Sequence, residues 1–166
     1  MQAFFSYFSR INIIISILLL VRLYLGWQWF ASGLTKVTSG TFDASGYLQG
    51  AIAQPVTAGA GPDIAYPWYV SFLEYIALPQ SELFSFVVMW GEVLVGLGLI
   101  IGCLTATAAL FGGLMNMSFL LAGTVSTNPI LLLLSFVVIL GRKHAGTLGV
   151  DGFLMYKNAQ QQKKSV

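Results

Sequence analysis

Three polar residues that could do chemistry stand inside long apolar stretches of the sequence. Arg22, Glu92 and Asn116 each lie near the middle of such a stretch. At the helical rise of about 1.5 Å per residue, these positions predict a common depth for the three side chains. Because an unpaired ionised side chain is costly in a bilayer, we expect Arg22 and Glu92 to face the protein interior and to pair.

Such a cluster has the groups that a quinone head group needs. Glu92 could accept or pass a proton with Arg22 as its electrostatic partner, and the Asn116 amide could donate to a carbonyl. Trp27 or Trp29, on the same stretch as Arg22, would supply an aromatic wall. The same groups would suit a small anion or a polar lipid head. A purely structural interpretation, in which they only hold helices in register, also stays open.

Small residues accompany each polar residue at helical spacing. A glycine stands four residues from each of the three, and these glycines are Gly26, Gly96 and Gly112. Residues four apart share one face of a helix, and small side chains let membrane helices approach closely. We therefore expect these faces to form the inner seam of a bundle. A second glycine face could pack within the bundle or against another protomer, and it comprises Gly91, Gly98 and Gly102.

The composition indicates an integral membrane protein. Of 166 residues, 57% are hydrophobic and 8% charged, which is too little charge to cover a water-facing globule of this length. Cys103 is the only cysteine and His144 the only histidine, so a disulfide relay and a bis-histidine haem are excluded. We expect no metal or haem, since no ligand spacing for one occurs, and no nucleic-acid partner.

The apolar stretches predict four membrane-spanning helices at about 11–34, 83–102, 105–126 and 129–145. The stretch from 83 to 126 is about twice the length of one crossing, so it must turn. Gly102 can end the first of its helices and Thr105 can cap the second. The predicted fold class is all-α: an integral membrane four-helix bundle in a single domain, 1–166, with short interfacial helices in a long extracytoplasmic loop.

Basic residues predict a multi-pass cell-membrane protein with both termini in the cytoplasm. Arg10 precedes the first span, and the residues after the last span include Arg142, Lys143, Lys157, Lys163 and Lys164. The loop 35–82 is then extracytoplasmic, and 146–166 is a cytoplasmic tail that can touch membrane lipids. Within the loop, 43–54 and 67–78 have the start and stop signals of short helices.

Two charged residues near the span ends complete the candidate site. Lys36 is the only basic residue of the acidic loop, so it is the local contact for an anionic or quinone ligand there. Asp151 follows the last span and is assigned a structural part, pairing with Arg142 or Lys143 to fix the end of the fourth helix.

Several motifs in combination resemble one family. They are Arg22-Leu-Tyr-Leu-Gly-Trp27, Ser32-Gly-Leu-Thr-Lys36, the glycine-rich segment 91–102, Gly113-Leu-Met-Asn116, 122–129 and 145–151. With them the chain resembles the DoxX/DoxD-like integral membrane proteins, including the membrane subunit of thiosulfate:quinone oxidoreductase. The resemblance implies a four-helix membrane fold with Arg22, Glu92, Asn116 and Asp151 on motif positions. It also implies thiosulfate oxidation, with a quinone as bound substrate and a second redox subunit as partner.

A function of another class remains open. A non-catalytic scaffold or assembly factor for a redox or stress-response partner would use the glycine faces and the aromatic loop, with Trp68 and Tyr69, to hold that partner. The same glycine faces could serve a homo-oligomer. Such a protein would have no redox activity in isolation, whereas the quinone-reactive subunit would lose activity when Arg22 or Glu92 is replaced.

Overall fold

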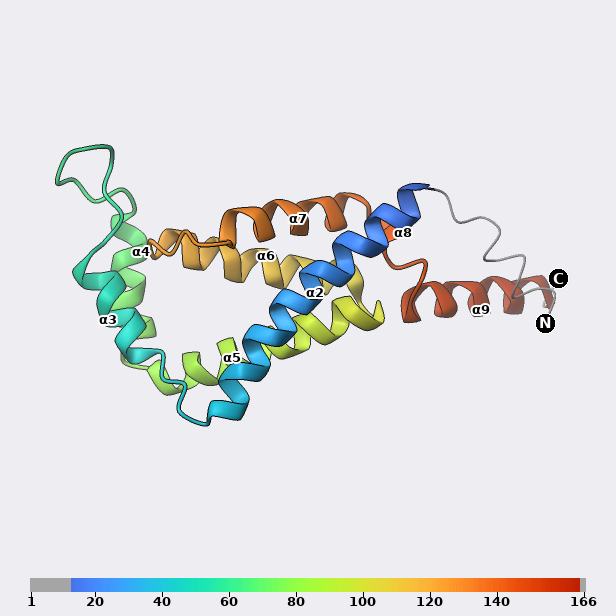
Figure 1. Ribbon diagram of the computed structural model, residues 1–166, viewed down its shortest axis with the longest axis horizontal. Coiled ribbons are helices and arrows are strands. Elements are labelled where there is room, and N and C mark those ends of the chain that lie inside the picture. The colour runs from blue at the N-terminus through green and yellow to red at the C-terminus, as the bar shows by residue number, and fades with distance from the viewer. Residues whose placement is uncertain (1–12, 165–166) are drawn as a thin grey trace.

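The computed structural model describes residues 13–164, and these residues are all-α, as the sequence predicts (Figure 1). Four apolar helices form the body: α2 (Ile13–Ser39), α5 (Ser81–Ile101), α6 (Thr105–Leu121) and α7 (Asn128–Leu140). By length and composition, α2 and α5 are able to cross a membrane, whereas α6 and α7 are shorter apolar helices. A one-turn helix, α8 (Arg142–Ala145), follows α7 after Gly141.

Glycines set the register between α2 and α5. A Cβ atom on Gly96 would lie 2.4 Å from the backbone nitrogen of Phe30, and one on Gly33 would lie 2.6 Å from that of Val93. No other residue type fits at such distances, so the backbones touch here. The contacts run in opposite directions along the two helices, which makes the pair antiparallel.

The turn between α5 and α6 is tight. Gly102 ends α5 in the left-handed conformation at φ 67°, as the sequence predicts. Thr105 does not cap α6, however. The cap comes from Asp151, whose carboxylate accepts the backbone N–H groups of Leu104 and Thr105 at 2.8 and 2.9 Å. A carboxylate at this place suits the positive end of the helix dipole.

The connection 35–82 folds into a cap at one end of the body. It contains α3 (Ser45–Ala53), α4 (Pro67–Phe72) and the π-helix η1 (Leu73–Ala77), all within the two segments predicted to be helical. Their apolar faces form a second hydrophobic cluster with Ala122 after α6. In Figure 1, α2 with α5 and α6 with α7 form two arms that separate toward α3 and α4.

The C-terminal segment, predicted as a tail, is helical. The helix α9 (Val150–Lys164) extends away from the body of the molecule (Figure 1). Its start lies in close contact with the α5–α6 turn. A Cβ atom on Gly149 would lie 2.8 Å from the Cα atom of Gly102, and the backbone N–H of Asp151 donates to the carbonyl oxygen of Gly102 at 2.9 Å.

Candidate functional site

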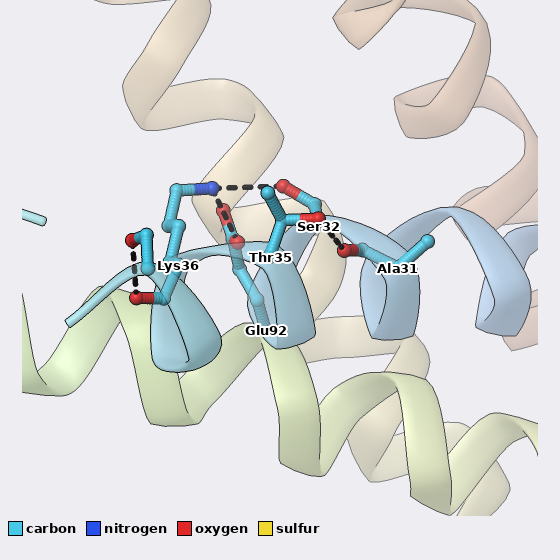
Figure 2. A network of polar contacts seen from close by, with 6 residues as sticks. Ala31, Ser32, Thr35, Lys36 and Glu92 are labelled. Atoms are coloured by element: carbon cyan, nitrogen blue, oxygen red, sulfur yellow. Dashed lines mark hydrogen bonds and ion pairs between the residues drawn. The ribbon is translucent and has the colours of Figure 1, made fainter.

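Glu92 and Lys36 form an ion pair between α5 and α2. The Nζ atom of Lys36 lies 2.6 Å from Oε2 of Glu92 and also donates to Oγ of Ser32 at 2.8 Å. Figure 2 shows Lys36 reaching both partners from its place on α2. The Glu92 side chain is 2% exposed and that of Lys36 is 22% exposed, so the carboxylate is the deeper member of the pair.

Local structure explains why Lys36 reaches this carboxylate. The helix α2 continues to Ser39, beyond the predicted end at 34, so Lys36 is helical and stands one turn after Ser32. Gly33, between them, lets α5 approach, because a Cβ atom there would lie 2.9 Å from Cβ of Glu92. The long lysine side chain then needs only to fold back along its own helix to meet the carboxylate.

The ion pair lies in the wall of a cavity of about 510 Å³ between the body and the cap. Most of the wall is apolar, with many aromatic rings: Phe42, Tyr47, Tyr69, Phe72, Phe84, Phe111 and Phe119. A cavity of this size with few polar groups is typical of small-molecule sites. Lys36 also lies 5.4 Å from the ring centre of Phe42, at the distance of a cation–π contact.

Two tyrosines fasten the cap over this cavity. The hydroxyl of Tyr69 donates to the carbonyl oxygen of Ser118 at 2.8 Å, and that of Tyr47 lies 2.9 Å from Oγ1 of Thr124. Burial raises the pKa of both tyrosines above its usual value, which keeps the phenols protonated and able to donate. These contacts link α3 and α4 to α6 and the residues that follow it.

The predicted pairing of Arg22 with Glu92 is wrong. Arg22 is buried, but its guanidinium donates to the carbonyl oxygens of Ala145 and Leu148 at 2.9 and 2.8 Å. Glu92 stands opposite Gly33 on α2, and positions 22 and 33 are separated by about 16 Å of helix. The expectation of a common depth failed because α2 continues to Ser39 and its register on α5 places Gly33, not Arg22, against Glu92. Arg22 instead lies against Gly102 at the end of α5.

Asp151 interacts with Arg22 and does not line the cavity. The two side chains interact electrostatically, and both Asp151 oxygens accept backbone N–H groups at the start of α6. The expected pair with Arg142 or Lys143 is therefore replaced by a helix cap. Together Arg22 and Asp151 fix the start of α9 against the α5–α6 turn, a structural part in keeping with the one expected for Asp151.

Asn116 and Trp29 contribute buried polar groups behind the cavity wall. Asn116 is fully buried, and neither atom of its amide has a hydrogen-bond partner; the same is true of the indole nitrogen of Trp29. A Cβ atom on Gly112, one turn before Asn116, would lie 2.8 Å from that nitrogen. Trp29 also packs on Phe119, a ring of the cavity wall, with the ring centres 6.5 Å apart.

Trp27 does not line the site. Its side chain is 61% exposed on the outer face of α2, so of the two tryptophans considered for an aromatic wall only Trp29 is inside. The second glycine face is also used within the chain. A Cβ atom on Gly98 would lie 3.2 Å from that of Ala108, and one on Gly102 would lie 2.4 Å from Arg22. Gly98 and Gly102 therefore make close contacts within the chain.

Sequence reasoning missed most of the cavity wall. It singled out Lys36 and Glu92 separately, and it did not identify Ser32, Tyr47 or Tyr69 as residues of the same wall. One signal was available, because Ser32 and Lys36 have the four-residue spacing of one helix face. Among residues 13–164, no three His, Cys, Asp or Glu side chains come together as metal ligands would.

Comparison with known proteins shows the family of the chain. The family model described as DoxX matches residues 17–126, which include Lys36, Glu92 and Asn116 but not Asp151. No curated protein and no solved structure was found that matches the chain.

Proposed function

This chain belongs to the DoxX family, and from that premise we propose that it is the quinone-binding membrane subunit of an oxidoreductase. The observation that carries the proposal is the Lys36–Glu92 ion pair in the wall of an aromatic cavity of about 510 Å³. Polar groups that are few, buried and convergent within an apolar pocket are what orient a quinone ring.

The proposed setting is a four-helix bundle that spans the membrane several times, with both termini in the cytoplasm. The distribution of polarity supports it, because large apolar side chains point outward while polar ones are inside. Leu20, Leu94 and Leu133 are each at least 64% exposed, whereas Arg22 and Glu92 are at most 2% exposed. In water this arrangement would be unfavourable, and in a lipid bilayer it is the expected one.

Lys36 is the residue proposed to hold the quinone head group. An ammonium group has three protons to donate, and two of them are directed at Glu92 and Ser32. The third remains for a carbonyl oxygen of the ring. Asn116 is proposed as a further hydrogen-bond donor to the quinone. Met115 and Phe119 line the cavity and Asn116 does not, so Phe119 has to move before the amide can reach the ring.

The proposed reaction needs two electrons and two protons to convert the quinone to a quinol. Lys36 is proposed to donate the two protons one after the other, one to each quinol oxygen. Glu92 stabilises the ammonium and relays a proton from the aqueous phase to Lys36 after each transfer. The two electrons come from a donor oxidised on a second redox subunit, and the family resemblance points to thiosulfate as that donor. In place of the predicted Arg22, the cation beside Glu92 in this proposal is Lys36.

Quinone binding by the purified chain in lipid nanodiscs tests the proposal. We expect Lys36→Met to weaken binding of ubiquinone or menaquinone by about tenfold or more, as loss of a hydrogen bond from a charged group implies. The matched control is Lys143→Met, because Lys143 is exposed and lies outside the cavity wall. The double variant Lys36→Met/Glu92→Leu removes both charges and keeps the test valid if the single variant unfolds. Undiminished binding by both variants would refute the proposal.

A non-catalytic scaffold is the second candidate, and one observation favours it. Trp68, Tyr75 and Ile76 are exposed on the outer side of the cap, with Trp68 at 64%. Aromatic residues of this kind anchor protein interfaces. A partner enzyme that co-purifies with the chain, and is lost on replacing Trp68 and Tyr75 with alanine while quinone binding is absent, would support this candidate instead.

A further inference from the structure

One opening in the wall of the cavity lies between α5 and α6. Val87 on α5 and Phe111 and Leu114 on α6 line the cavity, yet they are 52%, 55% and 53% exposed. Residues that face a cavity and the outside at once mark its edge. The cavity therefore reaches the lateral surface of the molecule between these two helices.

The packing of α5 against α6 explains the opening. Near the turn the helices touch closely, since a Cβ atom on Gly98 would lie 3.2 Å from that of Ala108. Two turns further on, Gly91 has no side chain, and the atom facing it is Sδ of Met115 at 3.5 Å from the place of a Cβ atom. The methionine side chain is flexible, so the α5–α6 interface at Gly91 and Met115 can adjust its shape to a bound ligand.

The opposite route, through the cap, is held by polar contacts. Tyr47 with Thr124 and Tyr69 with the backbone of Ser118 fasten α3 and α4 over the end of the cavity. A ligand that entered there would have to break these contacts. At the lateral edge the exposed lining residues are Val87, Phe111, Leu114 and Ser118. The first three are apolar, and the Ser118 hydroxyl donates to the Leu114 carbonyl of its own helix, so it does not tie α6 to α5.

We propose that the ligand enters sideways, from the hydrocarbon of the bilayer, through a portal between α5 and α6 formed by Val87, Phe111 and Leu114. This inference rests on the proposed function and narrows its substrate class. The ligand is an amphiphile with a carbonyl-bearing ring and a long apolar tail. The ring reaches Lys36 and Glu92, and the tail remains in the portal and in the lipid outside.

Size and polarity support a long-tailed ligand over a short, water-soluble one. A cavity of about 510 Å³ is in the range that encloses a compact ring system, and a long polyprenyl tail does not fit in the same space. The tail must therefore leave the cavity, and an apolar edge that faces lipid is the favourable exit. A water-soluble quinone would gain nothing from the three apolar side chains of the portal.

A tail-labelled quinone tests the portal directly. The chain in nanodiscs is irradiated with a polyprenyl quinone that has a diazirine on the first units of its tail, and the labelled peptides are identified by mass spectrometry. We expect label on the segments 83–90 and 110–117, with competition by unlabelled long-tailed quinone. Label confined to 55–66, on the cap side, would overturn the portal.

A bulky substitution gives the second measurement. Leu114→Trp should fill the portal and weaken long-tailed quinone binding by about tenfold, the effect expected from overpacking a well-fitted site. Leu110→Trp is the matched control, because Leu110 is similarly exposed one turn earlier on α6 and does not line the cavity. Equal binding by the two variants would overturn the portal while leaving quinone binding intact. Failure of both short-tailed and long-tailed quinones to bind the unmodified chain would instead refute the proposed function.

Discussion

Glu92 meets Lys36 because Gly33 stands between them in the interface of α2 and α5. The missing side chain lets the α5 backbone come so close that a Cβ atom on Gly33 would overlap Cβ of Glu92 at 2.9 Å and the backbone nitrogen of Val93 at 2.6 Å. The carboxylate then lies within reach of a lysine one helical turn from Ser32. The ion pair is thus a consequence of backbone packing, and its disruption can be tested at the glycines as well as at the charges.

Alanine at Gly96 should destabilise the fold. Its Cβ atom would lie 2.4 Å from the backbone of Phe30, so α2 and α5 must separate, and we expect a loss of about 1–3 kcal/mol or more in unfolding free energy. Gly50→Ala is the matched control, because nothing lies within 4 Å of its Cβ position and Gly50 is inside α3. There alanine should stabilise by about 0.5–1 kcal/mol. Thermal unfolding of both variants in one detergent measures the difference, and a stable Gly96→Ala protein would contradict the packing.

Removing one member of the ion pair should cost more than removing both. Lys36→Met leaves the buried carboxylate of Glu92 without its cation, and loss of one partner of a buried pair typically costs about 3–5 kcal/mol. We expect a smaller loss here because Lys36 is partly exposed, and Lys36→Met/Glu92→Leu should recover most of it. Denaturation of the wild type, both single variants and the double variant gives the coupling energy. Additive losses would mean that the two charges do not interact.

The sequence predicted the all-α class and the buried polar residues, because composition and periodicity depend only on local chemistry. Arg22, Glu92 and Asn116 are all buried on inner helix faces. The partners were not predictable in the same way. The sequence-based depth of each polar residue was counted from the ends of its apolar stretch. The register of α2 on α5 is instead set by close glycine contacts between the two helices. Lys36 and Glu92, which meet in this interface, are 56 residues apart in the sequence.

The cap and the start of α6 also depend on contacts that the sequence did not predict. Short helices at 43–54 and 67–78 followed from their proline stops, but the tyrosine contacts that fasten them to α6 depend on tertiary packing. Likewise Gly102 was recognisable as a helix end, while the carboxylate that caps α6 comes from Asp151, 46 residues beyond Thr105. Contacts at this separation leave no periodic signal in a single sequence.

Asp151→Ala should loosen the start of α6 and of α9. The variant loses two hydrogen bonds to backbone N–H groups and a charge that balances the buried Arg22, so we expect a loss of about 1–3 kcal/mol. Asp63→Ala is the control, since Asp63 is an exposed loop residue whose backbone carbonyl, not its side chain, accepts a hydrogen bond. Hydrogen exchange of the 104–108 and 150–154 amides reports the local effect. Unchanged protection in Asp151→Ala would show that the cap contributes little.

Asn116→Leu should stabilise the protein while weakening quinone binding. Both amide atoms are buried without a partner, and an unsatisfied buried polar group costs about 1–3 kcal/mol, so an apolar residue of similar size relieves that cost. A residue kept at such a cost is a candidate for function. Unfolding temperature and quinone affinity, measured on the same preparation, separate the two effects. Raised stability with unchanged affinity would assign Asn116 no part in binding.

High pH should detach the cap. Burial raises the pKa of Tyr47 and Tyr69 in the folded protein above the usual value for a phenol, about 10. A group whose folded pKa is raised contributes stability that is complete below the unfolded pKa and is lost as pH rises through the folded pKa. The contribution is therefore present at neutral pH and declines above about pH 10. Hydrogen exchange or limited proteolysis of 45–78 across this range measures cap opening. The control variant Tyr47→Phe/Tyr69→Phe lacks both ionising hydroxyl groups. Its cap should be looser at neutral pH, and cap opening should no longer depend on pH above about 10. If this variant retains the full alkaline transition, other residues cause it.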